Sequence, residues 1–142
     1  MPYQKAYSKI ATNVTAQQIW AIWSDIDKRH VWDHDTEWAK IDGEFKEGNT
    51  FKFKPKGGPK LTMKISECTP NKSFTDCFKL PLARLYGVHE IEAVEGGLCI
   101  VTTMKVVGPL YWLWRKLLVE KIIATLPEQT EHLIAAARQV KI

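Results

Sequence analysis

The chain has 142 residues, a length typical of one folded domain, and 45% of them are hydrophobic, which is enough to build a core. Its 20 lysines and arginines outnumber its 16 aspartates and glutamates, giving a formal net charge of +4. Because the basic residues are interleaved with acidic ones, they form no continuous basic stripe of the kind that binds nucleic acid. We therefore expect one globular domain over residues 1–142, with no nucleic-acid partner.

The amino-terminal sequence and the cysteines indicate the cellular compartment. The first ten residues, MPYQKAYSKI, lack the apolar segment of a signal peptide. The three cysteines, Cys68, Cys77 and Cys99, show no CxxC spacing, and an odd number without a secretion signal favours free thiols in a reducing compartment. We expect a cytoplasmic protein.

The first 35 residues predict a strand followed by two short helical segments. Residues 3–12 have a strand pattern, and Thr15 is a suitable N-cap for a helix from Ala16 to about Ser24. The apolar positions of this helix are Ile19, Trp20, Ile22 and Trp23. The polar and aromatic segment that follows, DIDKRHVWDHD, predicts a short second helix or a turn.

The middle of the chain predicts a series of antiparallel strands. Apolar and polar residues alternate in segments at hairpin spacing, and turn residues such as Gly57-Gly58-Pro59 and Gly96-Gly97 separate them. The predicted strands cover 36–46, 49–56, 60–68, 72–80, 83–94 and 98–107. With the first strand they form a sheet of about seven strands.

The last segment, from Gly108 to Val140, predicts a long helix. Pro109 is suited to the first helical position, and the residues after it are apolar on nearly every side, as in a helix that packs against an apolar surface. Charged residues interrupt the apolar run before it reaches the length of a membrane span. Pro127 predicts a kink, because proline removes one helical hydrogen bond. We expect a long kinked helix that lies across a curved sheet and lines a cavity.

This order of elements predicts an α+β helix-grip fold, and here the chain resembles the START-like (SRPBCC) superfamily, within it the polyketide cyclase/dehydrase-type proteins. The resemblance covers essentially the whole chain and is carried by IWAIWSDIDKRHVWDHDTEW, IDGEFKEGNTFKFKP, KSFTDCFKLPLARLYGVHEIE, GPLYWLWRK and TLPEQTEHL. It implies an interior cavity that binds hydrophobic small molecules. These segments are patterns of the fold and leave the reaction open.

Three polar residues share strand faces with apolar neighbours, which points them inward. They are Asp76, His89 and Glu37. A buried carboxylate is costly without a partner, and His89 is positioned to be the partner of Asp76. A His–Asp pair in an apolar cavity, with Glu37 nearby, could act as general acid and base on an enolisable ligand. The alternative is a structural pair that takes no part in chemistry.

The candidate ligand-binding residues are mostly apolar side chains on the inner face. Trp32 belongs to the loop expected at the cavity opening, and Trp112 to a minor apolar strip of the long helix, where aromatic rings suit flat ligands. Alternation turns Arg84 outward, either as a surface residue or at the cavity mouth, where it could bind a ligand carboxylate or phosphate. The remaining predicted wall residues are Phe53, Met63, Phe78, Met104 and Leu117.

His30 and His34 are four residues apart and would share one face of a helix, as two metal ligands require. Zinc needs three or four converging ligands, and no third ligand stands at a characteristic spacing. We therefore predict no metal site and no cofactor.

Three function classes remain open. The sequence slightly favours a carrier of a hydrophobic or aromatic, lipid- or polyketide-like molecule, because no nucleophile and base stand out together. The second class is a cyclase- or dehydratase-like enzyme that uses His89 and Asp76 with Glu37. The third is an interaction protein whose apolar helix docks a partner or a second copy of the chain, as in a homodimer.

Overall fold

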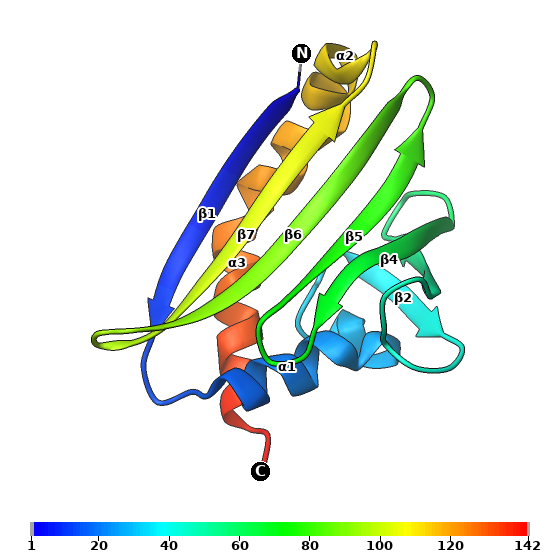
Figure 1. Ribbon diagram of the computed structural model, residues 1–142. Coiled ribbons are helices and arrows are strands. Elements are labelled where there is room, and N and C mark those ends of the chain that lie inside the picture. Colours follow the sequence, from blue (N-terminus) through cyan, green and yellow to red (C-terminus); the bar gives the residue numbers. More distant parts are fainter. Residues whose placement is uncertain (1, 142) are drawn as a thin grey trace.

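The computed structural model describes residues 2–141, which form a curved antiparallel sheet crossed on one side by a long helix (Figure 1). The seven strands lie in the order β1-β7-β6-β5-β4-β3-β2, and every neighbouring pair is antiparallel. Their bounds are β1 (Tyr3–Ala11), β2 (Thr36–Ile41), β3 (Thr50–Pro55), β4 (Leu61–Thr69), β5 (Ser73–Leu80), β6 (Ala83–Val94) and β7 (Gly97–Val107). This confirms the predicted α+β helix-grip architecture.

Two short helices follow β1, as predicted. They are α1 (Ala16–Ser24) and the 3-10 helix η1 (Ile26–Val31). A capping box starts α1: the hydroxyl of Thr15 accepts from the Gln18 backbone amide at 3.1 Å, and the Thr15 amide donates to the Gln18 side chain at 2.9 Å. The amphipathic pattern of α1 then buries Ile19 and Trp23.

The strand faces follow the alternation of the sequence with two interruptions. The inner side chains of β5, β6 and β7 are buried or half-buried at every second position. Register shifts occur in β2 between Thr36 and Trp38 and in β4 between Ile65 and Glu67. The strand predicted over 36–46 ends at Ile41, because the Asn49 side chain bonds the carbonyls of Asp42 and Glu44 and holds the segment as a turn.

The long helix consists of α2 (Tyr111–Trp114), a π-helical turn η2 (Arg115–Val119) and α3 (Glu120–Arg138). Helical structure continues through Pro127, and the irregular stretch lies earlier, in η2. A π turn contains an extra residue, so it shifts which side chains face the sheet. Within residues 2–141, none of the helices combines the length and the apolar character needed to cross a membrane.

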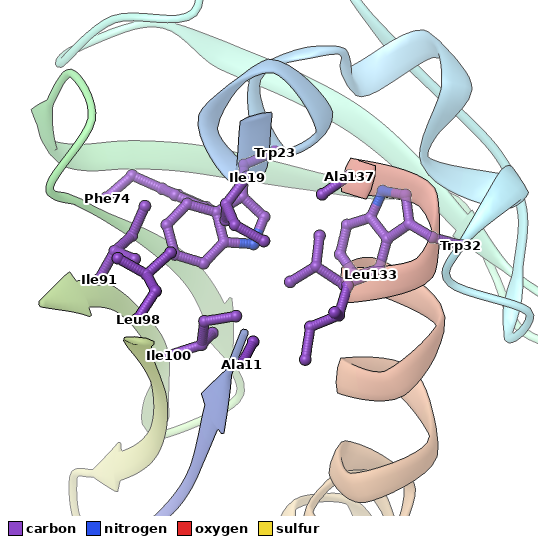
Figure 2. Packing of buried hydrophobic residues seen from close by; sticks show 11 residues of the cluster. Ala11, Ile19, Trp23, Trp32, Phe74, Ile91, Leu98, Ile100, Leu133 and Ala137 are labelled. Carbon is purple, nitrogen blue, oxygen red and sulfur yellow. The ribbon is translucent and has the colours of Figure 1, made fainter. Parts of the chain in front are cut away.

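Eleven buried hydrophobic residues cluster near the C-terminal end of α3, a region that we call the packed end. There α1 inserts between the sheet and α3, as Figure 2 shows for Ile19 and Trp23 against Phe74 and Leu133. The Trp23 ring meets the Phe74 ring edge to face at 5.2 Å. The buried members of this cluster are Ala11, Ile19, Trp23, Trp32, Phe74, Ile91, Leu98, Ile100, Leu133, Ile134 and Ala137.

Candidate ligand cavity

The space between the sheet and the long helix is not filled beyond the packed end. It holds a cavity of about 450 Å³, lined by β3 to β7 on one side and by η2 and α3 on the other. None of the lining residues belongs to α1, so the aromatic side chains of α1 do not fill this part of the space between the sheet and the helix. The apolar wall residues are Phe53, Leu61, Met63, Phe78, Leu85, Met104, Leu118, Ile122 and Leu126.

Charged residues mark where the cavity meets solvent. Of its lining residues, Asp35, Lys56 and Lys121 are exposed, whereas most of the others are buried or half-buried. Asp35 precedes β2, Lys56 follows β3, and Lys121 lies in the first turn of α3. The cavity therefore opens between the start of β2 and the end of β3 on one side and the first turn of α3 on the other.

A polar cluster lies in the otherwise apolar wall, centred on two neighbouring strands. Asp76 of β5 and His89 of β6 are 5% and 7% exposed, and both line the cavity. Asp76 pairs with Gly87 in the register of the two strands, so the side chain of His89, two residues further along β6, lies diagonally beside the carboxylate. His89 Nε2 is 3.8 Å from Asp76 Oδ2, which is close but longer than a hydrogen bond.

Burial determines the charge of both groups. Desolvation raises the pKa of Asp76 from 3.8 to about 6, although the Arg29 guanidinium and the backbone amides of Gly87 and Asp76 oppose the rise. Desolvation and, to a smaller extent, the positive charge of Arg29 lower the pKa of His89 from 6.5 to about 3, although the Asp33 carboxylate opposes the shift. At neutral pH the imidazole is therefore neutral, and the contact between His89 and Asp76 is not an ion pair.

Arg29 supplies the positive charge of the cluster. It comes from η1, and its Nε donates to Asp33 Oδ2 at 3.1 Å, with both side chains largely buried at 14% and 5% exposure. Its guanidinium carbon lies 5.5 Å from the centre of the Trp32 ring and 5.2 Å from that of Phe53. These contacts hold the guanidinium against the cavity, where Asp33 balances its charge.

Gly87 makes room for the carboxylate of Asp76. A Cβ atom at this position would lie 2.6 Å from Asp76 Oδ1 and 3.3 Å from His89 Nε2. Glycine in the middle of a strand weakens the strand, and it commonly marks a place where another group must come close. Here the missing side chain allows Asp76 to lie over the backbone of β6.

His89 marks the border between the cavity and the packed end. Its ring stacks on Phe74 with centroids 4.3 Å apart and an interplanar angle of 12°, and it meets Trp23 at 5.7 Å. The same imidazole also lines the cavity. The packed end therefore fixes the orientation of a polar group in the cavity wall.

Solved structures of other proteins share this architecture, whereas comparison of sequences finds no match. No family model matches the sequence, and no curated protein matches it either. Among solved structures, protein NE0264 from Nitrosomonas europaea is 13% identical, with 97% of this chain and 96% of that chain covered and a TM-score of 0.73. Ara h 8.0201 is 10% identical, with 97% and 96% covered and a TM-score of 0.64.

A third similar structure is the di-domain ARO/CYC protein StfQ of the steffimycin biosynthetic pathway. It is 10% identical, and the match covers 98% of this chain but 51% of StfQ, with a TM-score of 0.76. The chain shares its helix-grip fold with these three structures. Identities this low establish the fold alone, so the chemistry of the cavity has to be argued from its own residues.

Six of the predicted site residues lie in the cavity wall. They are Phe53, Met63, Phe78, Met104, Asp76 and His89. All six lie on strands, where a period of two fixes which side chains point inward. Their predicted orientation is confirmed, and their role in binding or catalysis remains a proposal.

Four of the predicted ligand-binding residues lie elsewhere. Trp112 of α2 and Leu117 are each 53% exposed. Leu117 lies in the π turn, where its neighbour Leu118 takes the place in the cavity wall. Arg84 is exposed on the outer face, as its alternation indicated, and does not line the cavity. Trp32 is 5% exposed and packs in the core beside Leu133, as Figure 2 shows.

The prediction that Glu37 points inward is wrong. Its side chain is 51% exposed and pairs with Lys54 at 2.8 Å on the outer face. The register shift between Thr36 and Trp38 buries Thr36 and Ala39 and leaves Glu37 outside. One extra residue in a strand reverses the faces on one side of it, which the sequence pattern does not reveal.

Sequence reasoning missed Arg29, Asp33 and Gln129, all of which line the cavity. Arg29 and Asp33 are four residues apart on η1 and the turn after it, a spacing at which opposite charges can pair on a helix. That signal was available in the sequence. Gln129 lies one helical turn after Thr125 and two after Lys121, so the i, i+4 row on α3 could also have been identified.

Proposed function

We propose that the protein binds a hydrophobic or aromatic small molecule, lipid- or polyketide-like, in the cavity between the sheet and the long helix. The observation that carries this proposal is a hollow of about 450 Å³ with a mainly apolar wall and a few convergent polar groups. That size and composition are typical of small-molecule sites. A protein that needed only stability would gain by filling such a space.

The polar cluster indicates what the ligand carries besides its apolar body. Arg29 offers N–H donors, Asp76 offers acceptors, and neutral His89 offers one donor and one acceptor. Thr102 of β7 adds a buried hydroxyl beside them. A hydroxyl, phenol or carbonyl group at one end of the ligand would satisfy these groups, and a purely aliphatic ligand would leave them unpaired.

Adjacent leucines provide a matched test. Leu118→Trp places a large ring into the cavity, whereas Leu117→Trp changes a side chain that is 53% exposed. We expect a fluorescent probe of apolar cavities, anilinonaphthalene sulfonate, to bind the wild type and Leu117→Trp equally. Leu118→Trp should bind it at least about tenfold more weakly, as the loss of 1.4 kcal/mol or more implies.

Solvent extraction of purified protein followed by mass spectrometry gives the second measurement. We expect a small apolar molecule with at least one oxygen-containing polar group to be released from the wild type and depleted in Leu118→Trp. If all three proteins bind the dye alike and release nothing, the cavity is not a ligand site.

A second function, acid–base catalysis on the bound molecule, is favoured by one observation. The pKa of Asp76, about 6, lies close to neutral pH, where a general base works best. Histidine with a pKa of about 3 is too weak a base, so in this reading neutral His89 donates or accepts a hydrogen bond while Asp76 moves the proton.

Proton exchange distinguishes an enzyme from a carrier. A cyclic β-diketone can be incubated with the protein in D₂O, and loss of its α-proton signal followed by NMR. Catalysis predicts protein-dependent exchange that rises with pH through about 6 and is lost in Asp76→Asn. Asp35→Asn, an exposed lining residue, is the matched control. Exchange no faster than in buffer would leave the carrier function alone.

A further inference from the structure

A second group of polar side chains lies outside the cavity, where the loop between η1 and β2 meets α3. His34 of the loop, with Glu128 and His132 of α3, brings together one ligand atom from each residue, all within 4.8 Å of one another. We infer that these three residues form a binding site for a divalent transition metal of the zinc class. This inference does not depend on the proposal that the cavity binds a ligand.

The geometry needs only small side-chain movements to close around an ion. The rings of His34 and His132 lie next to each other in a tilted arrangement, with centroids 4.1 Å apart and 33° between their planes. His132 Nε2 is 4.0 Å from Glu128 Oε1, too far for a hydrogen bond. Ligand atoms about 2.0–2.2 Å from tetrahedral zinc lie about 3.3 Å from one another, so each must move by about 1 Å or less.

The donor set selects the kind of metal. Two imidazoles and one carboxylate suit zinc and its neighbours in the first transition row, whereas calcium and magnesium prefer oxygen ligands only. Glu128 and His132 are four residues apart on one face of α3, which is the spacing that two ligands on a helix require. Three protein ligands leave a fourth position for water or another small ligand.

The three residues are too far apart in the chain to form a recognisable metal motif. The spacing of His30 and His34 suggested a pair that lacked a third ligand, but His30 is not part of the cluster. The partners of His34 lie more than 90 residues further along the chain and come close only through the fold. His34 is exposed and the His132 side chain is 33% exposed, so an ion can reach both.

Metal binding would fasten the loop to the helix. Asp33 and Asp35, on either side of His34, line the cavity, and so does Gln129, next to Glu128. Through His34, the ion would hold the loop at the side where the cavity opens. Metal binding itself does not depend on the proposed ligand, so failure of one proposal is distinguishable from failure of the other.

The test uses untagged full-length protein titrated with Co²⁺ and Zn²⁺. We expect one ion per chain and a Co²⁺ absorption spectrum of tetrahedral type without a sulfur charge-transfer band. His34→Ala and His132→Ala should each weaken binding at least about tenfold, since even supporting residues of metal sites have effects of this size. His30→Ala, an exposed histidine outside the cluster, should bind like the wild type.

Hydrogen exchange provides the readout that a purely adventitious ion would not change. Zinc should slow amide exchange over residues 33–36 in the wild type and in His30→Ala, but not in His34→Ala. Because the substituted histidines are at the surface, unchanged melting temperatures without metal should show that the variants fold. Binding that survives both His34→Ala and His132→Ala, binding only through the thiols, or no binding below millimolar concentration would overturn the inference.

Discussion

The packed end and the cavity lie between the same two layers, the sheet and the long helix, yet they are filled differently. At the packed end, Ile19 and Trp23 of α1 enter the gap and are 0% and 2% exposed, with Leu133 of α3 at 4% (Figure 2). Further along the helix, Phe78 and Leu118 line about 450 Å³ of unfilled space and are only half-buried. One short helix makes this difference.

This contrast separates two tasks in one fold. Close packing supplies stability, because every methylene removed from such a region costs both burial and contacts. The cavity instead sacrifices contacts on one side of each wall residue and keeps room for another molecule. His89, stacked on Phe74 yet lining the cavity, connects the two regions.

The largest expected effect tests this contrast directly. Trp23→Ala should lower the free energy of unfolding by about 3–5 kcal/mol, since it removes a fully buried aromatic ring. Phe78→Ala should cost at most about half as much, because one side of its ring already faces empty space. Urea unfolding at neutral pH measures both. Equal losses would mean that the cavity wall carries as much of the stability as the packed end.

Most of the fold could be predicted because the governing signals are local. Thr15 and Gln18 form the capping box within four residues, and Asp76 and His89 follow the period of two on their strands. Periodicity fails at two irregular places. The strand period of two fails at Glu37, beside the register shift in β2, and the helical period fails at Leu117, in the π turn. Such insertions depend on tertiary packing, which sequence periodicity does not record.

The polar cluster could be predicted only in part. The inward positions of Asp76 and His89 follow from alternation, but their pKa values depend on how deeply the folded chain buries them. The place of Arg29 depends on where η1 lies against the sheet, which no local pattern fixes. Likewise His34 meets His132 only through the complete fold. Contacts between distant segments are the part that the sequence alone left undetermined.

The next effect concerns the charge of Asp76. Its pKa is about 6 in the folded chain and 3.8 ordinarily, so ionisation costs stability: the penalty is absent below pH 3.8 and complete above pH 6. The free energy of unfolding of Asp76→Asn, relative to that of the wild type, should therefore increase by about 2–3 kcal/mol as the pH rises from 4 to 7. Urea unfolding of both proteins at each pH gives the difference, in which all other titrating groups cancel.

His89 should behave in the opposite sense. Its folded pKa, about 3, lies below the ordinary value of 6.5, so its contribution to stability is complete above pH 6.5 and is lost as the pH falls toward 3. The free energy of unfolding of His89→Gln should therefore increase relative to that of the wild type as the pH falls. A pH-independent difference for either variant would mean that its group remains solvated, and the cavity would then be wetter than its walls indicate.

A smaller effect is expected from Gly87→Ala. The new Cβ would lie 2.6 Å from Asp76 Oδ1, so the carboxylate has to move, at a cost of about 1–3 kcal/mol. The double variant Gly87→Ala with Asp76→Ala removes the clashing atom and should cost less than the sum of the single changes. Additive losses in urea unfolding would show that Gly87 is needed for some other reason.

Glu37→Gln should have the smallest effect on the free energy of unfolding. This variant also tests whether the polar cluster extends as far as β2. The side chain is 51% exposed, and its pair with Lys54 is a surface ion pair, for which the usual contribution is about 0–1 kcal/mol. Dye binding should be unchanged, whereas Asp76→Asn alters a group in the cavity wall and should change it. If Glu37→Gln weakened dye binding as much as Asp76→Asn, the β2 edge would have to turn inward when a ligand binds. An unchanged dye affinity would confine ligand recognition to the inner face of the sheet, the helix and η1.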